Sequence, residues 1–248
     1  MTDSPSAKSS RILSSVLTPA LRLWLRSQVQ QIDKLELQIA GGDRQLLGGY
    51  VPRVDVSAEN AVYQGLHLTQ IRLSGTNIRV NLRQILRGKP LQLLEVVPVV
   101  GETMITEADL NASLRSPLLS QAVSEFLVTL LRSGEADLLD APADDLNFDQ
   151  MRIQLGAGQF TLSANLISVS GTPTAIAIRT GLKVADGHQL QLDQPQWLPH
   201  AQAKRGLPLK DLDGWTIDLG DDVQLEQLAI DPEKIACQGR INVIPLPE

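Results

Sequence analysis

Short runs of alternating apolar and polar residues recur along most of this 248-residue chain, and they constrain its fold more than any other feature. KLELQIA (34–40) and VPRVDVSA (51–58) each place their apolar residues on one face of a strand. From Leu146 onward similar runs follow one another to the C-terminus. Regularly spaced strands with the helices set apart from them predict an antiparallel α+β fold and not alternating βαβ units.

Turn residues divide these runs. LTQIRLSGTNIRVNL (68–82) predicts a hairpin around Gly75 and Asn77. A second hairpin turn is expected at the glycines of 154–158, and a further turn at Asp186-Gly187.

Helical signals return between residues 106 and 132. Thr106 and Asp109 have capping-box spacing, and Ser116-Pro117 begins a second helix. On a helical wheel the apolar residues of that second helix cover roughly 220°, about twice the arc that one buried face needs. The helix is therefore either wrapped by a curved sheet or lines a cavity. Its apolar residues are Leu118, Leu119, Ala122, Val123, Phe126, Leu127, Leu130 and Leu131.

The most apolar stretch near the N-terminus, SSVLTPALRLWLRSQV (14–29), predicts a helix with two different faces. Thr18-Pro19 can act as N-cap and first helical position, so a break or a kink is expected before Pro19. The apolar face either packs on a sheet, or lies in a membrane interface while arginines meet anionic headgroups; both hold if the helix borders a lipid site. The polar side carries Arg11, Ser15, Thr18, Arg22 and Arg26, and the apolar side carries Leu13, Val16, Leu17, Ala20, Leu21 and Trp24.

This N-terminal segment does not read as a membrane span or as a signal peptide. No run reaches the roughly 18 uncharged apolar residues of a spanning helix, and no small-x-small cleavage site follows 12–24. We expect the segment to be retained and the protein to be cytoplasmic, peripherally bound to a thylakoid or plasma membrane. Residues 1–10 are expected to form a flexible N-terminus, and 11–248 a single domain.

Composition and motifs give no sign of a reaction. A net charge of −6 argues against a general nucleic-acid binder. His67, His188 and His200 lack metal-ligand spacing, and the acidic pairs Asp144-Asp145 and Asp221-Asp222 are typical of solvated loops. Cys237, the only cysteine, is expected to be a packed thiol. We expect no catalytic residues, no metal and no cofactor.

Several long segments resemble the LmeA-like phospholipid-binding family, and more closely its cyanobacterial branch. They are LTPALRLWLRSQV, GGDRQLLGGYVP, NAVYQGLHLTQIRLSGTNIRVNL, ILRGKPLQLL and TEADLNASLRSPLL. The resemblance extends from about Ser15 to the C-terminus. It implies a TULIP-like fold, in which a strongly curved antiparallel sheet wraps a long helix and leaves an apolar groove for acyl chains.

The resemblance makes lipid the expected partner. Acyl chains would lie against apolar residues of the N-terminal helix, the central strands and the 117–132 helix, namely Leu17, Leu21, Trp24, Ile71, Leu73, Ile78, Val80, Leu118, Phe126, Leu127 and Leu130. Headgroups would remain near Arg22 and Arg26. A groove and a closed core both require Leu, Ile and Val, so the pattern leaves both open.

Two other functions are compatible with the sequence. The curved sheet or the N-terminal helix could hold a protein partner in an assembly or scaffold role. An enzyme of lipid or glycan metabolism ranks below both, because no catalytic motif is present.

Overall fold

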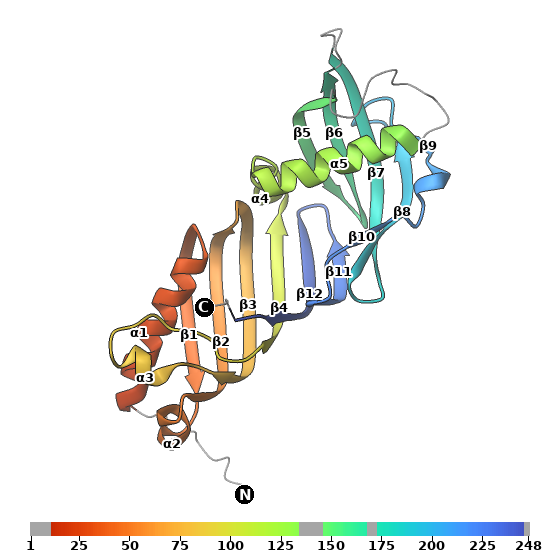
Figure 1. Cartoon of the computed structure of the whole chain (residues 1–248). Helices are drawn as coiled ribbons and strands as arrows, with labels where there is room; N and C mark the ends of the chain where they lie inside the picture. The colour runs from red at the N-terminus through yellow and green to blue at the C-terminus, as the bar shows by residue number, and fades with distance from the viewer. Residues whose placement is uncertain (1–10, 134–145, 168–172, 246–248) are drawn as a thin grey trace, which may run out of the picture.

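The computed structural model describes residues 11–133, 146–167 and 173–245, with side chains from residue 17 onward and up to Arg132 in the first of these ranges. It is a mixed α+β protein with two antiparallel sheets and few helices (Figure 1), which confirms the predicted class. The strands are divided between two sheets and do not form one continuous sheet.

The first sheet has six strands in the order β1-β2-β3-β4-β12-β11. Their bounds are β1 Gln31–Ala40, β2 Tyr50–Tyr63, β3 Leu66–Arg79, β4 Val97–Thr106, β12 Lys234–Val243 and β11 Val223–Ile230. The C-terminal hairpin β11–β12 therefore extends a sheet begun by the N-terminal strands, because β12 pairs with β4 along its whole length.

The second sheet follows the order β10-β8-β7-β6-β5, and β9 pairs with β8. Its strands are β5 Asn147–Gly156, β6 Gln159–Ile167, β7 Pro173–Ala185, β8 Gln189–Trp197, β9 Leu207–Pro208 and β10 Thr216–Asp218. The turns predicted at 154–158 and at Asp186-Gly187 connect β5 to β6 and β7 to β8.

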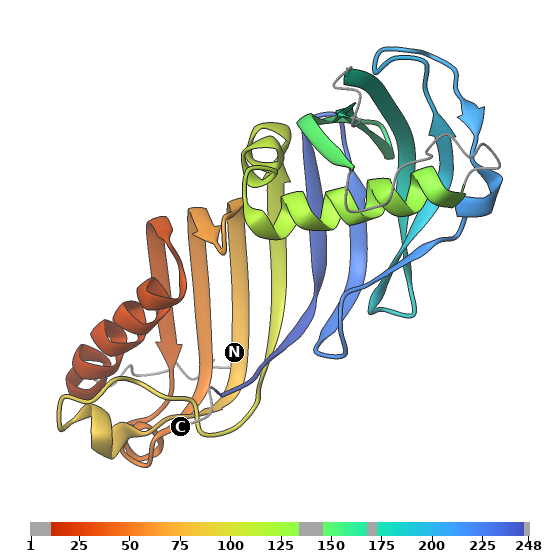
Figure 2. The same ribbon diagram turned by 45° about the horizontal axis from the view of Figure 1, so that its top comes forward.

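The helices are α1 Arg11–Gln28, α2 Asp43–Leu47, α3 Leu82–Ile85, α4 Glu107–Ser113, α5 Pro117–Ser133 and the short 3-10 helix η2 Lys210–Leu212. α1 lies over β1, and α5 crosses the second sheet on the same side of the molecule (Figures 1 and 2). The Thr106 hydroxyl accepts a hydrogen bond from the Asp109 amide and begins α4 as predicted.

Two sequence predictions about local structure are wrong. The predicted break before Pro19 is absent, because α1 is one helix with Pro19 inside it, although a proline in a helix removes one backbone hydrogen bond. The stretch around Gly75 and Asn77 is not a hairpin but the end of the continuous strand β3. Gly75 is paired on both sides, with Val54 and Val99, so it lies inside the sheet.

The two sheets meet along the outer edge of β11. The Gly158 amide, in the β5–β6 turn, donates to the Ile230 carbonyl at 2.9 Å, and the Leu225 amide donates to the Gly187 carbonyl in the β7–β8 turn. On the other side of the second sheet, α4 covers the edge of β5. There the Asn111 side chain donates a hydrogen bond to the Ile153 carbonyl and accepts one from the Ile153 amide.

Two hydrophobic cores result. The first lies between the first sheet and α1, α2 and α3, and the second lies between the second sheet and α5. Between them, none of the described helices lies over the middle of β3, β4 and β12 on the face of the first sheet that carries α1 (Figure 1).

Candidate functional site

The uncovered part of the first sheet is apolar. Cross-strand pairing aligns Leu73, Gly101, Gly239 and Leu225 in one row, and Ile71, Thr103, Cys237 and Leu228 in the next. Because side chains alternate along a strand, these rows share the face on which α1 packs. We call its apolar residues the floor: Ile71, Leu73, Ile105, Leu225, Leu228, Ile235, Cys237 and Ile241.

The floor belongs to neither core as a unit. Of its residues only Leu73 packs against the first core, and none belongs to the second, as far as the described residues show. Ile241 is exposed and the others are half-buried. An apolar face that none of the described helices covers is a candidate site for another molecule.

Two glycines lie in the middle of the floor. Gly101 of β4 and Gly239 of β12 are direct partners, so neither strand places a side chain there. At Gly239 an added Cβ would collide with the backbone carbonyl of Gln224, because β11 bulges toward β12 at this point. The close approach of two backbones therefore requires a glycine.

Cys237 lies in the floor between Thr103 and Leu228. Burial raises the pKa of its thiol above the ordinary value. A thiol that resists ionisation is a poor nucleophile, so its environment is that of a packed side chain.

The opposite face of the first sheet is hollowed. A groove of about 860 Å³ lies where β3, β4, β12 and β11 approach β7, and a smaller hollow of about 430 Å³ continues toward β1 and β2. Both are lined by Arg72 and Glu102, whose charged groups are 3.9 Å apart. The larger groove is also lined by apolar residues, among them Met104, Leu182 and Val184, and by Leu228 and Cys237 of the floor.

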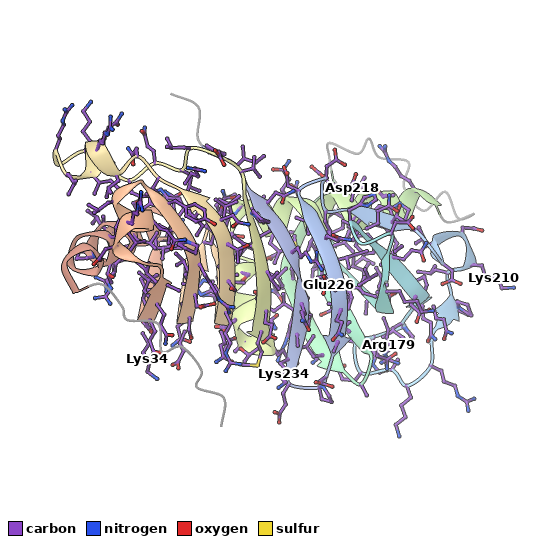
Figure 3. All side chains as sticks on the ribbon, turned by 90° about the horizontal axis from the view of Figure 1, so that it is seen from below. Lys34, Arg179, Lys210, Asp218, Glu226 and Lys234 are labelled. Atoms are coloured by element: carbon purple, nitrogen blue, oxygen red, sulfur yellow. The ribbon has the colours of Figure 1, made fainter. Side chains whose placement is uncertain are left out.

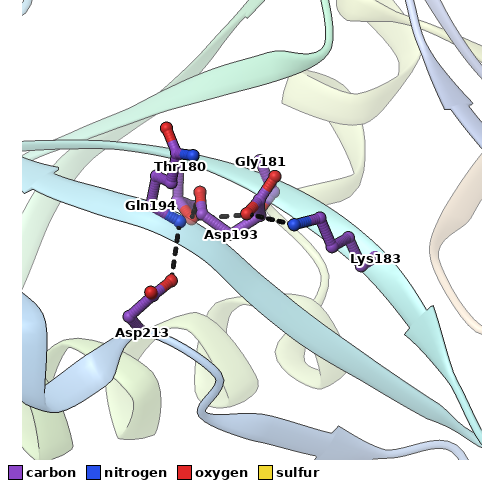
Figure 4. A network of polar contacts seen from close by, with 6 residues as sticks. All are labelled: Thr180, Gly181, Lys183, Asp193, Gln194 and Asp213. Atoms are coloured by element: carbon purple, nitrogen blue, oxygen red, sulfur yellow. Dashed lines mark hydrogen bonds and ion pairs between the residues drawn. The ribbon is translucent and has the colours of Figure 1, made fainter.

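The wall of the larger groove on β7 is held by a polar network with β8 (Figure 4). Lys183 forms an ion pair of 2.6 Å with Asp193, and the Thr180 hydroxyl donates to the Asp193 carbonyl at 3.2 Å. Asp213 accepts from the Gln194 amide at 2.9 Å. These bonds lock β7 against β8, so the charges of this wall are already satisfied within the protein.

The residues predicted on the N-terminal helix and the central strands divide between core and surface. Leu17, Ile78 and Val80 are buried in the first core. Leu21 and Trp24 are half-buried against it, and Arg22 and Arg26 are exposed. Ile71 and Leu73 lie in the floor. α1 therefore packs on the sheet with its arginines outward.

The predicted residues of the 117–132 helix lie on α5. Leu127 is fully buried (0% exposed) and Leu130 nearly so, both in the second core. Phe126 is half-buried, with its ring centroid 5.5 Å from that of Trp215. Leu118 is exposed. Lipid contact at the residues named from the sequence remains a prediction.

Sequence reasoning missed the floor residues on β4, β11 and β12: Ile105, Leu225, Leu228, Ile235 and Ile241. Their alternation was visible, but the pairing of β12 with β4 joins segments more than a hundred residues apart. No local signal shows such a pairing.

Chemistry other than binding finds little support in the described residues. In these ranges no group of three or more His, Cys, Asp or Glu side chains is placed to hold a metal ion. Asp144-Asp145 lie outside the described residues. None of the described helices combines the length and the apolar character needed to cross a bilayer.

The chain matches a known protein family over most of its length. No curated protein and no solved structure matches the chain. Residues 9–240, nearly the entire chain, match the family model described as LmeA-like phospholipid-binding. The protein is a member of the LmeA-like phospholipid-binding family.

Proposed function

We propose that this protein binds phospholipid without catalysis and that the acyl chains lie on the floor. The observation that carries the proposal is the half-exposed apolar face of β3, β4, β12 and β11 between the two cores. Membership of a phospholipid-binding family supports lipid as the occupant.

The energetics favour acyl chains. Each methylene removed from water contributes about 0.8 kcal/mol, so two chains can be retained without a polar anchor. α1 and α5 border the floor on either side.

We place the protein at a membrane surface. Arg22 and Arg26 are exposed on α1, at the border of the first core, where they can contact anionic headgroups. The floor itself carries no charged side chain, which suits acyl chains and leaves the headgroups to α1. Among its eight residues only the Cys237 thiol can ionise, and burial raises its pKa.

The test is native mass spectrometry of the purified protein, with extraction and identification of any bound lipid. A stoichiometric phospholipid is the expected result. An apo mass that is unchanged after incubation with phospholipid vesicles would contradict the proposal and favour a protein-binding role.

A matched pair of variants locates the site. Leu228→Lys places a charge on the floor and should abolish lipid retention. Gln227→Lys places the same charge on the neighbouring, exposed residue, which faces the opposite side of β11, and should retain lipid. Equal retention by both variants would show that lipid lies elsewhere.

A further inference from the structure

α2 and α3 together form a tip at one end of the first sheet (Figures 1 and 2). The Val80 amide donates to the Gly49 carbonyl at 2.9 Å and links the two segments. Leu46, Leu82 and Ile85 anchor the tip in the first core. β3 leads into the tip and β4 begins after it, so the tip lies at one end of the strands that carry the floor.

The tip is basic, in contrast to the protein as a whole. Residues 80–94 contain Arg83, Arg87 and Lys89 and no aspartate or glutamate, and α2 adds one acid, Asp43, and one base, Arg44, in a chain with a net charge of −6. All three cations are exposed, and none of the described ion pairs includes them. Figure 3 shows nitrogen-tipped side chains extending into solvent from the α3 end of the molecule.

Two large apolar side chains are exposed beside these cations. Leu86 follows α3 and is 58% exposed, and Leu47 ends α2 and is 61% exposed. Neither contributes to a core within the described structure. Leucine next to unpaired arginine and lysine is the composition of segments that enter an anionic membrane interface.

The loop after α3 is also held in a defined shape. The buried Asn81 side chain donates to the Pro90 carbonyl at 3.0 Å and accepts from the Gln92 amide at 2.8 Å. The Lys89 amide donates to the Gln84 carbonyl at 3.0 Å. A loop that is already ordered loses little conformational entropy when it binds.

We propose that the α2–α3 tip docks on an anionic phospholipid bilayer. Arg83, Arg87 and Lys89 contact lipid phosphates, while Leu86 and Leu47 enter the headgroup region. This deepens the membrane part of the proposed function by naming the docking element, but it does not depend on lipid being held on the floor. Docking through the tip brings one end of the floor next to the bilayer.

The experiment is co-sedimentation with vesicles of phosphatidylcholine alone or of phosphatidylcholine mixed with phosphatidylserine. The protein should bind only the anionic vesicles, and 1 M salt should release it, since screening then acts within about 3 Å. Failure to bind anionic vesicles at low salt would overturn the proposal and leave an acidic protein as the partner to test.

The decisive variant is Arg83→Gln/Arg87→Gln/Lys89→Gln. Each cation near an anionic surface is worth about five-fold in affinity, so the triple variant should bind about a hundred-fold more weakly. The matched control is Lys204→Gln/Arg205→Gln/Lys210→Gln, which removes three exposed cations near the exposed Leu207, outside the tip and beside Asp211 and Asp213. If both triple variants lost the same amount of vesicle affinity, the loss would follow from net charge alone, and the assignment of docking to the tip would be overturned.

Insertion of the tip into the headgroup region can be measured separately from binding, by tryptophan fluorescence. Leu86→Trp should shift its fluorescence to shorter wavelength with anionic vesicles, and an unchanged spectrum would overturn insertion of this residue. Circular dichroism and thermal unfolding show whether each variant folds. Native mass spectrometry of the Arg83/Arg87/Lys89 triple variant separates the two proposals, because lipid retained on the floor with lost vesicle binding is expected if both hold.

Discussion

Leu73 of β3 and Gly101 of β4 are directly opposite one another, and the leucine occupies the space that a side chain at position 101 would need. A Cβ added to Gly101 would lie 2.7 Å from the Cδ2 atom of Leu73. The leucine thus leans across the neighbouring strand at the centre of the floor.

This contact predicts a strong coupling between the two positions. Gly101→Ala should lower the free energy of unfolding by about 1 kcal/mol, because Leu73 must leave its rotamer. In the Leu73→Ala background the same change should be neutral or stabilising, since alanine restricts the unfolded chain more than glycine does. Urea unfolding of the four proteins of this double-mutant cycle measures the coupling, and additive effects would contradict the contact.

Cys237 offers a direct report on occupancy of the floor. Because burial raises the pKa of its thiol, modification by a neutral maleimide should be slow at neutral pH and faster as pH rises. Bound phospholipid should slow the reaction further by covering the sulfur. Labelling rates by mass spectrometry, with and without lipid, check this, and Cys237→Ser serves as the unlabelled control. Equal rates in both states would place the lipid elsewhere.

Leu130→Trp tests whether α5 contributes to a groove or to a closed core. Leu130 is buried among second-core residues, so the larger ring should cost about 1–3 kcal/mol of stability. Lipid retention should be unchanged if acyl chains lie on the floor. The control is Leu118→Trp at the exposed start of the same helix, which should change neither property. Loss of lipid with unchanged stability would instead assign Leu130 to a groove.

Asp55 predicts a small pH-dependent contribution to stability. The guanidinium of Arg53, 2.8 Å away, lowers the pKa of the Asp55 carboxyl; partial burial opposes this shift and Ser74 supports it. Because the folded pKa lies below the unfolded one, the stabilisation is present above the ordinary aspartate pKa of about 3.9 and is lost as pH falls through the lowered value.

Both partners are largely exposed, so Asp55→Asn should cost less than about 1 kcal/mol at neutral pH and almost nothing in strong acid. Urea unfolding at the two pH values measures the difference. Arg53→Gln should remove the pH dependence of the Asp55→Asn effect. A difference that persists in the Arg53→Gln background would assign the shift to another neighbour.

Several elements were predictable because their causes are local. Thr106 and Asp109 locate the start of α4 through a hydrogen bond between residues three apart, and Pro117 begins α5 where its missing amide is not needed. The exposure of Arg22 and Arg26 and the burial of Leu17 follow from the helical period of α1. The same local reasoning failed at Gly75, where glycine serves close packing inside a sheet and not a turn.

The sequence by itself determined the alternation of the strands, the caps of the helices and the family of the protein, since each depends on residues near one another or on their linear order. Tertiary structure alone decided which apolar residues are buried. Leu127 and Ile71 both satisfy an apolar pattern, yet the first is enclosed by the second sheet and the second lies on an uncovered face. The difference arises because β12 pairs with β4 and extends the sheet beyond the reach of α1 and α5, and such long-range pairing leaves no local trace.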